Sequence, residues 1–219
     1  MKNPVRSMIA LLALLGAMGL SPSASAQDAK AGEKKAAMCI GCHGIPDYKA
    51  SFPEVYRVPK IAGQNAKYII SALNQYKKGD RKHPTMRGIA ASLSDQDMAD
   101  LAAFYSTEAK ADPVPAALAG AVPADVAELL KKGNCASCHG ANFSTPIDPS
   151  YPKLAGQHGD YLYIALREYQ TDKNALVGRN NAIMMGMARP FSPAEAKTLA
   201  AYFATLPGEL ATVPQDRWR

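Results

Sequence analysis

Two short runs in this chain of 219 residues have residue types and a spacing that could do chemistry. Each run reads Cys-x-x-Cys-His, and the two begin at Cys39 and Cys135. On a turn of helix, this spacing presents two thiols to the two vinyl groups of a haem, and the adjacent imidazole can reach the iron from one side of the ring. The predicted attachment residues are Cys39, Cys42, Cys135 and Cys138, and the predicted iron ligands are His43 and His139.

Three other kinds of site use a Cys-x-x-Cys pair. A thioredoxin-like redox pair needs a βαβ context, and the chain has no alternating runs of Val, Ile and Thr that predict strands. A zinc site needs a fourth ligand beside the two cysteines and one histidine of each run. A disulfide would have to close a tight loop of two residues. Because the motif occurs twice in a chain that is expected to be helical and exported, haem attachment is favoured over all three.

The second axial ligand of such a haem decides its use. Methionine raises the reduction potential and supports electron transfer, whereas an empty position allows ligand binding or peroxide chemistry. Met86 follows Cys39 by 47 residues and Met184 follows Cys135 by 49, and each lies eight residues before a serine that opens a helix. We predict Met86 and Met184 as the second ligands, on loops that fold over the haem face, with Met185 as the alternative in the second run.

Other methionines and histidines have ordinary explanations. Met38 and Met98 are expected to fill the core. His83 and His158 could replace methionine as iron ligands, but neither has a histidine at the equivalent position of the other half. We therefore expect both to be solvated loop histidines.

The two cysteine runs belong to a longer internal repeat. The sequence Pro-Lys-x-Ala-Gly-Gln begins at Pro59 and again at Pro152, and Leu-Ala-Ala followed by two aromatic residues begins at Leu101 and again at Leu199. The blocks keep their order, with offsets of 93 to 98 residues. This pattern indicates a duplication.

Residues 1–26 predict a secretory signal. Lys2 and Arg6 precede an apolar run of 13 residues, and the segment ends in Ala-Ser-Ala. The run is shorter than the roughly 20 residues that a membrane span needs, and the Ala-x-Ala end disfavours a retained anchor. We expect export to a bacterial periplasm, with the mature chain beginning at Gln27.

The mature chain is expected to fold as two small domains. Residues 113–123 are rich in Ala and Pro and predict an extended linker. The expected domains are residues 27–112 and 124–219. Domains of this size bury a limited core and often need a cofactor as a staple.

Local patterns predict helices and no strands. Apolar residues recur at three and four positions from Tyr68 onward. Ser94 and Ser192 each open a helix with the spacing of a capping box, and Asp160 is expected to cap a helix that begins near residue 161. The predicted fold is all-α, with three or four helices around a covalent haem in each domain.

Net charge is +6 for the chain and +4 from Gln27 onward, where 23 basic residues face 19 acidic ones. Two haems bring up to four propionate charges, which would roughly cancel this excess. Because the sequence also has no Arg-rich or aromatic-interleaved patch, nucleic-acid binding is excluded. One basic stretch could steer an acidic partner or be a solvated loop, and it contains Lys77, Lys78, Arg81 and Lys82.

The sequence resembles the class I cytochromes c in its attachment runs, its Pro-Lys-x-Ala-Gly-Gln blocks and its segments from methionine to Leu-Ala-Ala. As a tandem pair of such domains, it resembles the dihaem cytochromes c4. The resemblance covers nearly all of the mature chain. It implies two haem c domains face to face around a pseudo-twofold axis. It also implies that the carbonyls of Pro59 and Pro152 accept hydrogen bonds from the ligand histidines. Because Pro84 precedes the first methionine segment and Asn181 the second, the two methionine loops are expected to differ.

The function that this resemblance implies is periplasmic one-electron transfer towards a terminal oxidase, not catalysis. An iron with histidine and methionine ligands keeps both in either oxidation state, which suits a carrier. The expected partners are redox proteins, with no transmembrane segment and with peripheral membrane association left open. The alternatives are a cytochrome subunit of a periplasmic dehydrogenase and a dihaem peroxidase, which needs a vacant axial position.

Overall fold

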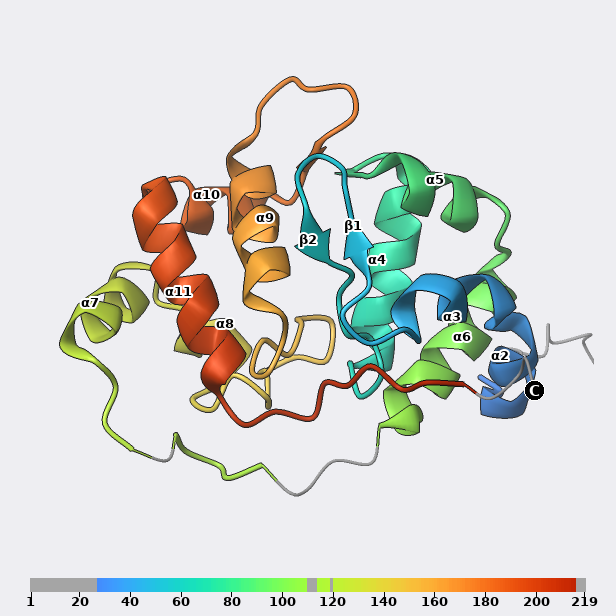
Figure 1. Cartoon of the computed structure of the whole chain (residues 1–219), viewed down its shortest axis with the longest axis horizontal. Helices are drawn as coiled ribbons and strands as arrows, with labels where there is room; N and C mark the ends of the chain where they lie inside the picture. The colour runs from blue at the N-terminus through green and yellow to red at the C-terminus, as the bar shows by residue number, and fades with distance from the viewer. Residues whose placement is uncertain (1–26, 110–113, 119, 216–219) are drawn as a thin grey trace, which may run out of the picture.

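The computed structural model describes residues 27–109, 114–118 and 120–215. The predicted signal, residues 1–26, and parts of the predicted linker lie outside these ranges. Two groups of helices lie beside each other, one from each copy of the repeat (Figure 1). None of the described helices combines the length and the apolar character needed to cross a bilayer.

Each copy contributes five helices to the described part of the chain. The first copy has α2 (Ala29–Lys35), α3 (Ala37–His43), α4 (Ala66–Lys78), α5 (Pro84–Ala91) and α6 (Asp95–Glu108). The second copy has α7 (Ala124–Lys132), α8 (Ala136–His139), α9 (Gly159–Gln170), α10 (Ala182–Ala188) and α11 (Pro193–Thr205). The mainly helical architecture is confirmed. The expected three or four helices per copy were too few, because the first helix is interrupted before the cysteine motif and the methionine segments are helical.

The described residues also form four two-residue strands, although no strands were expected. β1 (Lys49–Ala50) pairs with β2 (Tyr56–Arg57), and β3 (Arg81–Lys82) pairs with β4 (Gly178–Arg179), both antiparallel. Strands this short carry no readable alternation in the sequence. The β3–β4 pair joins the two copies and sets Arg81 opposite its repeat equivalent, Arg179. Equivalent segments that pair antiparallel in this way indicate an approximate twofold rotation between the copies.

The last helix of each copy begins at a capping box, as predicted. Ser94 Oγ accepts a hydrogen bond from the Asp97 amide at 3.1 Å, and the Asp97 carboxylate accepts one from the Ser94 amide at 2.9 Å. Ser192 and Glu195 make the same reciprocal pair at the start of α11. These bonds satisfy backbone donors that would otherwise lack partners at a helix start.

The prediction that Asp160 caps α9 is wrong. The helix begins two residues earlier than expected, at Gly159 after the cap residue His158, and Asp160 lies inside its first turn. The Asp160 carboxylate instead accepts hydrogen bonds from the backbone amide and the Nε of Arg57, each at 3.0 Å. Asp160 therefore links the second copy to the first.

Each copy has an apolar core, and the core of the second copy also includes Tyr56 of the first. In the first, Met98 and Leu101 are fully buried, which confirms Met98 as a core residue. Met38 is 53% exposed, so its predicted core role is wrong. The inward positions around it are taken by Ala36 and Ile40, four residues apart on one helical face, and a residue midway between them faces the other side.

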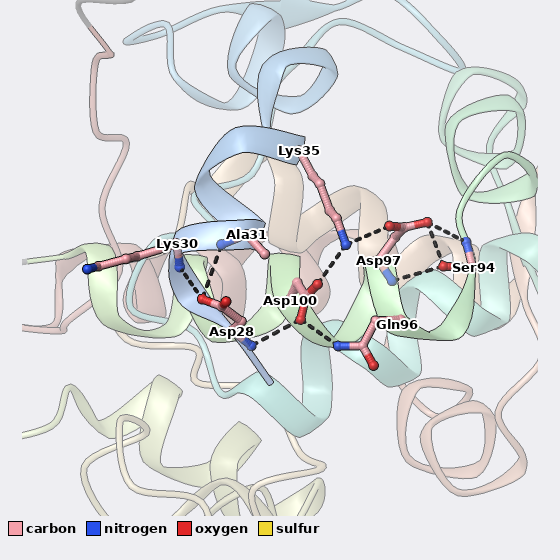
Figure 2. A network of polar contacts seen from close by, with 8 residues as sticks. All are labelled: Asp28, Lys30, Ala31, Lys35, Ser94, Gln96, Asp97 and Asp100. Carbon is pink, nitrogen blue, oxygen red and sulfur yellow. Dashed lines mark hydrogen bonds and ion pairs between the residues drawn. The ribbon is translucent and has the colours of Figure 1, made fainter. Parts of the chain in front are cut away.

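A polar network fixes the helix that leads into the first cysteine motif (Figure 2). Lys35 at the end of α2 donates to Asp97 at 2.8 Å and to Asp100 at 2.6 Å on α6. Asp100 also accepts from the Asp28 amide at 3.0 Å and the Gln96 side chain at 2.7 Å. The two helices touch at Gly32, where a Cβ would lie 2.0 Å from the Asp100 carbonyl oxygen. Glycine is therefore required for this close approach.

The repeated Pro-Lys-x-Ala-Gly-Gln blocks form a symmetric clasp between the copies. The Gln157 amide group accepts from the Lys60 backbone N–H at 3.0 Å and donates to the Lys60 carbonyl at 2.8 Å. Gln64 makes the same pair of bonds with the Lys153 backbone, at 2.9 and 3.1 Å. Both glutamines are buried. The sequence showed that these blocks repeat, but not that they bind each other.

The C-terminal segment that follows α11 crosses to the first copy and runs along it (Figure 1). The Ala211 amide donates to the Ala62 carbonyl at 3.0 Å, and the Gln215 side chain donates to Glu108 at the end of α6. The second copy therefore holds the first through its tail as well as through the clasp.

Replacing the buried Asp100 with asparagine tests the network of Figure 2. We expect Asp100→Asn to lower the free energy of unfolding of the holoprotein by about 2 kcal/mol near pH 7, because the charge-assisted bond from Lys35 is lost. That bond also holds the pKa of Asp100 below its ordinary value. The difference from wild type should therefore be complete above about pH 4 and shrink as the pH falls below it.

Denaturant titrations at several pH values measure this difference. The exposed Asp95, in the first turn of the same helix, provides the control. Asp95→Asn should stay within about 0.5 kcal/mol of wild type. Equal losses in the two variants would contradict a special role for Asp100.

Removing one half of the clasp should loosen one side of the interface. In Gln157→Ala, the Lys60 amide loses its partner, so we expect that amide to exchange with solvent more than about tenfold faster. The Lys153 amide, bound by Gln64, should keep its protection. Hydrogen exchange followed by NMR on the reduced holoprotein measures both. Gln64→Ala should give the reverse pattern, and unchanged exchange at Lys60 in Gln157→Ala would show that the clasp does not hold.

Candidate haem-binding site

The four cysteines lie at one cavity that extends across both copies. Its volume is about 790 Å³, and its walls are mainly apolar. Cys39 and Cys42 lie on α3, whereas Cys135 and Cys138 lie at the start of α8 and within it. All four are free thiols of intermediate exposure. The structure therefore brings the two predicted attachment runs, 96 residues apart in sequence, to a common space.

The thiol environment disfavours the alternative explanations of the motif. Burial raises the pKa of Cys39, and raises that of Cys135 to about 11. Redox-active Cys-x-x-Cys pairs instead depend on a lowered thiol pKa. Within the described residues, no three or more His, Cys, Asp and Glu side chains gather in a way that could hold a metal ion, so the zinc alternative has no ligand set there.

Each predicted ligand histidine is held by a proline carbonyl. His43 Nδ1 lies 2.9 Å from the Pro59 oxygen, and His139 Nδ1 lies 2.9 Å from the Pro152 oxygen. A carbonyl can only accept, so Nδ1 carries the proton and Nε2 keeps its lone pair for a metal. Burial lowers the pKa of both rings, which favours the neutral form. The expected hydrogen bonds from the histidine rings to the proline carbonyls are confirmed.

The methionine segments are helices, not the predicted loops. α5 begins after His83, whose Nδ1 accepts a hydrogen bond from the Met86 amide at 3.3 Å. α10 begins after Asn181, whose side chain accepts one from the Met184 amide at 3.0 Å. In both copies the methionine is the third residue of its helix. Its backbone amide donates a hydrogen bond to the side chain of the cap residue that precedes the helix. The two segments share this kind of cap but differ in detail, as expected: α5 is capped by His83 and begins with Pro84, whereas the shorter α10 is capped by Asn181.

The cavity distinguishes between the candidate ligands. Met86 and Met184 both line it, as does the half-exposed Met187, whereas Met185 is not among the described residues that line it.

His83 reaches the cavity but is engaged as a helix cap, so it is not a solvated loop histidine. His158 is buried, in a smaller pocket, so that prediction is wrong for it as well.

The rest of the lining fits a bound porphyrin. Four tyrosines line the cavity, and they are Tyr68, Tyr76, Tyr161 and Tyr169. Burial raises the pKa of Tyr68 to about 12, which keeps this phenol neutral. Apolar walls, thiols, neutral imidazoles and methionines in one cavity form the donor set that a covalent haem needs.

Sequence reasoning missed a buried charged cluster at this cavity. Arg81 was grouped with the basic stretch that ends at Lys82, but its side chain is buried against tyrosines and is not part of the surface. It lies with Arg179 and Glu168. The sequence did contain one signal for this cluster, because an arginine stands at equivalent positions of both copies, 98 residues apart.

Comparisons with known proteins agree with this site. The cytochrome c family profile matches residues 29–107 and again residues 123–207. Cytochrome c4 of Azotobacter vinelandii is 32% identical over 92% of this chain and 99% of its own length. A thiosulfate dehydrogenase electron acceptor of Stutzerimonas stutzeri is 34% identical, covering 89% of this chain and 94% of its own.

Solved structures include the crystal structure of reduced recombinant cytochrome c4 from Pseudomonas stutzeri. It is 27% identical, with a TM-score of 0.59 over 83% of this chain and all of that one. The two matched domains, each with its cysteine pair and its histidine and methionine, imply two covalent haems and an electron carrier, not an enzyme. The chain therefore belongs to the cytochrome c family, within the dihaem cytochromes c4.

Proposed function

We propose that each copy holds one haem by the residues predicted from its motif. Cys39 and Cys42 form the thioethers in the first copy, with His43 and Met86 as axial ligands. The corresponding thioethers in the second copy come from Cys135 and Cys138, and its axial ligands are His139 and Met184. Each thiol adds across a vinyl group, with sulfur on one carbon and hydrogen on the other, so the attachment needs no oxidant.

One observation carries this proposal: each histidine lines the cavity with its Nδ1 engaged by a proline carbonyl, which leaves Nε2 free for a metal, and a methionine of the same copy lines the same cavity. When bound, haem supplies a one-electron iron couple. The chain's own part is to keep both ligands in place. The proline carbonyls fix the imidazoles, and the helix caps at His83 and Asn181 fix the backbone of the methionines. Little has to move when an electron arrives, which suits fast transfer.

The methionine assignment predicts a separate effect for each copy. We expect wild-type holoprotein to show two one-electron waves at positive potentials. Met86→Ala and Met184→Ala should each remove one of them, because methionine ligation raises the potential. Potentiometric titration followed by optical spectroscopy measures this.

Met185→Ala is the matched control, because this neighbouring methionine does not line the cavity in the described structure. It should keep both waves. If Met185→Ala removes a wave and Met184→Ala keeps both, the assignment in the second copy is wrong.

The location and organisation also belong to the proposal. We infer that residues 1–26 are removed on export and that the protein works in the periplasm. Its domains are residues 27–112 and 124–219, joined by the linker 113–123. The apolar run with its Ala-Ser-Ala end and the Ala- and Pro-rich composition of the linker support these boundaries.

We further propose that a periplasmic dehydrogenase supplies the electrons and that a terminal oxidase receives them. The similarity to a thiosulfate dehydrogenase electron acceptor supports thiosulfate dehydrogenase as the donor. Exposed apolar side chains lie where the cavity reaches the surface, at Phe52 in the first copy and at Ile183 in the second. Apolar rims of this kind suit brief docking of a redox partner.

A charge placed on this rim should slow the donor reaction. We expect Ile183→Lys to lower the rate at which thiosulfate dehydrogenase with thiosulfate reduces the holoprotein, by about tenfold, without removing either wave. Leu176→Lys is the control, because Leu176 is equally exposed but does not line the cavity. Stopped-flow absorbance measures both rates. Absence of any reduction by this enzyme would exclude it as the donor.

A further inference from the structure

Two arginines that the haem motifs leave unexplained are buried between the copies. The β3–β4 pair sets Arg81 opposite Arg179, and both line the haem cavity. Their exposed fractions are 5% and 7%. A guanidinium stays charged in a protein, so each needs a counter-charge within reach once water is excluded.

Arg179 has a counter-ion of its own. Its Nε donates to the Glu168 carboxylate at 2.6 Å, and both side chains are 6% exposed. It also donates to the Tyr161 hydroxyl at 3.4 Å. This pair is neutral as a unit.

Arg81 has only neutral partners among the described residues. Its two terminal nitrogens donate to the hydroxyls of Tyr68 at 3.3 Å and Tyr161 at 2.6 Å, and its guanidinium lies 4.6 Å from the centroid of the Tyr76 ring. Its Nε is buried without a hydrogen-bond partner in that part of the chain. The protein thus keeps one uncompensated cation and one unused donor at the cavity.

The two copies differ here by a single charge. The repeat offset of 93 places Gln75 at the position that corresponds to Glu168. Gln75 is neutral, and its amide donates to the Ser71 hydroxyl at 3.2 Å. The first copy therefore lacks the carboxylate that neutralises the arginine of the second.

We propose that Arg81 binds a propionate of one of the two haems and serves as its counter-ion. This rests on the proposed function, because it needs haem in the cavity. A haem carries two propionates, and the fork of an arginine matches a carboxylate in shape and charge. The free Nε supplies a donor for it. Arg81 acts here as a positioning residue that keeps the propionate ionised.

Other charged or titratable groups lie around Arg81, and they are His43, Tyr68, Tyr76, His83, Tyr161, Glu168 and Arg179. Burial raises the pKa of the Tyr161 hydroxyl, but the two guanidinium groups outweigh this and hold it below its ordinary value. Of these, only histidine ordinarily changes charge between about pH 5 and 8. A propionate without its cation would be a second such group, because burial raises a carboxyl pKa. The pH dependence of the haem potentials therefore reports on the Arg81 bond.

The experiment is a potentiometric titration of holoprotein variants from pH 5 to pH 8. In Arg81→Gln, one wave should shift to lower potential, and its midpoint should acquire a dependence on pH that wild type lacks. Gln75→Glu should shift the wave in the same direction, because it gives Arg81 the carboxylate that the second copy already has. Arg81→Lys keeps the charge and should stay close to wild type. The control is Arg57→Gln, since Arg57 is an interface arginine already paired with Asp160, and it should leave the pH dependence unchanged.

Each outcome either supports or overturns the bond between Arg81 and a propionate. Unchanged waves in Arg81→Gln overturn the inference, and so does a lowered wave without pH dependence, which would mean that Arg81 acts only at a distance. If adding His83→Asn to Arg81→Gln abolishes the new pH dependence, the titrating group is His83 and the inference fails. Wild-type protein without haem or without two positive waves would overturn the proposed function itself. Two wild-type waves with an unaltered Arg81→Gln overturn only the propionate bond.

Discussion

The orientation of each ligand imidazole depends on a backbone segment that the other copy holds in place. Pro59 binds the His43 ring through its carbonyl, and the next residue, Lys60, has both its backbone N–H and its carbonyl bound by Gln157. The same order holds in the second copy with the roles exchanged. The geometry of each proposed iron site is therefore coupled to the interface, and neither half of the cavity is defined by one copy alone.

This coupling gives a physical reason for keeping the duplication as one chain. Each copy is small, and a domain of that size has little core with which to fix a ligand rigidly. The clasp, the β3–β4 pair and the crossing C-terminal segment supply the missing constraints. Within this symmetric frame, Gln75 and Glu168 break the symmetry. Two otherwise similar haem sites can differ in electrostatics without differing in ligands.

The sequence predicted features that depend on neighbours along the chain. The cysteine motif and the capping boxes at Ser94 and Ser192 are local patterns. In the structure, α6 and α11 begin directly after these two serines, as the capping boxes predicted. The sequence analysis failed where contacts between distant segments determine the structure. Nothing adjacent to Arg81 shows that tyrosines of both copies bury it. His83 was overlooked as a cap because histidine is rarely used as one.

The claim at the centre of this account is that each copy carries its own covalent haem. Mass spectrometry of the purified exported protein, followed by peptide mapping, tests it most directly. We expect two added porphyrins, one on the peptide with Cys39 and Cys42 and one on the peptide with Cys135 and Cys138. An intact mass with one porphyrin or none, or both on a single peptide, would contradict it.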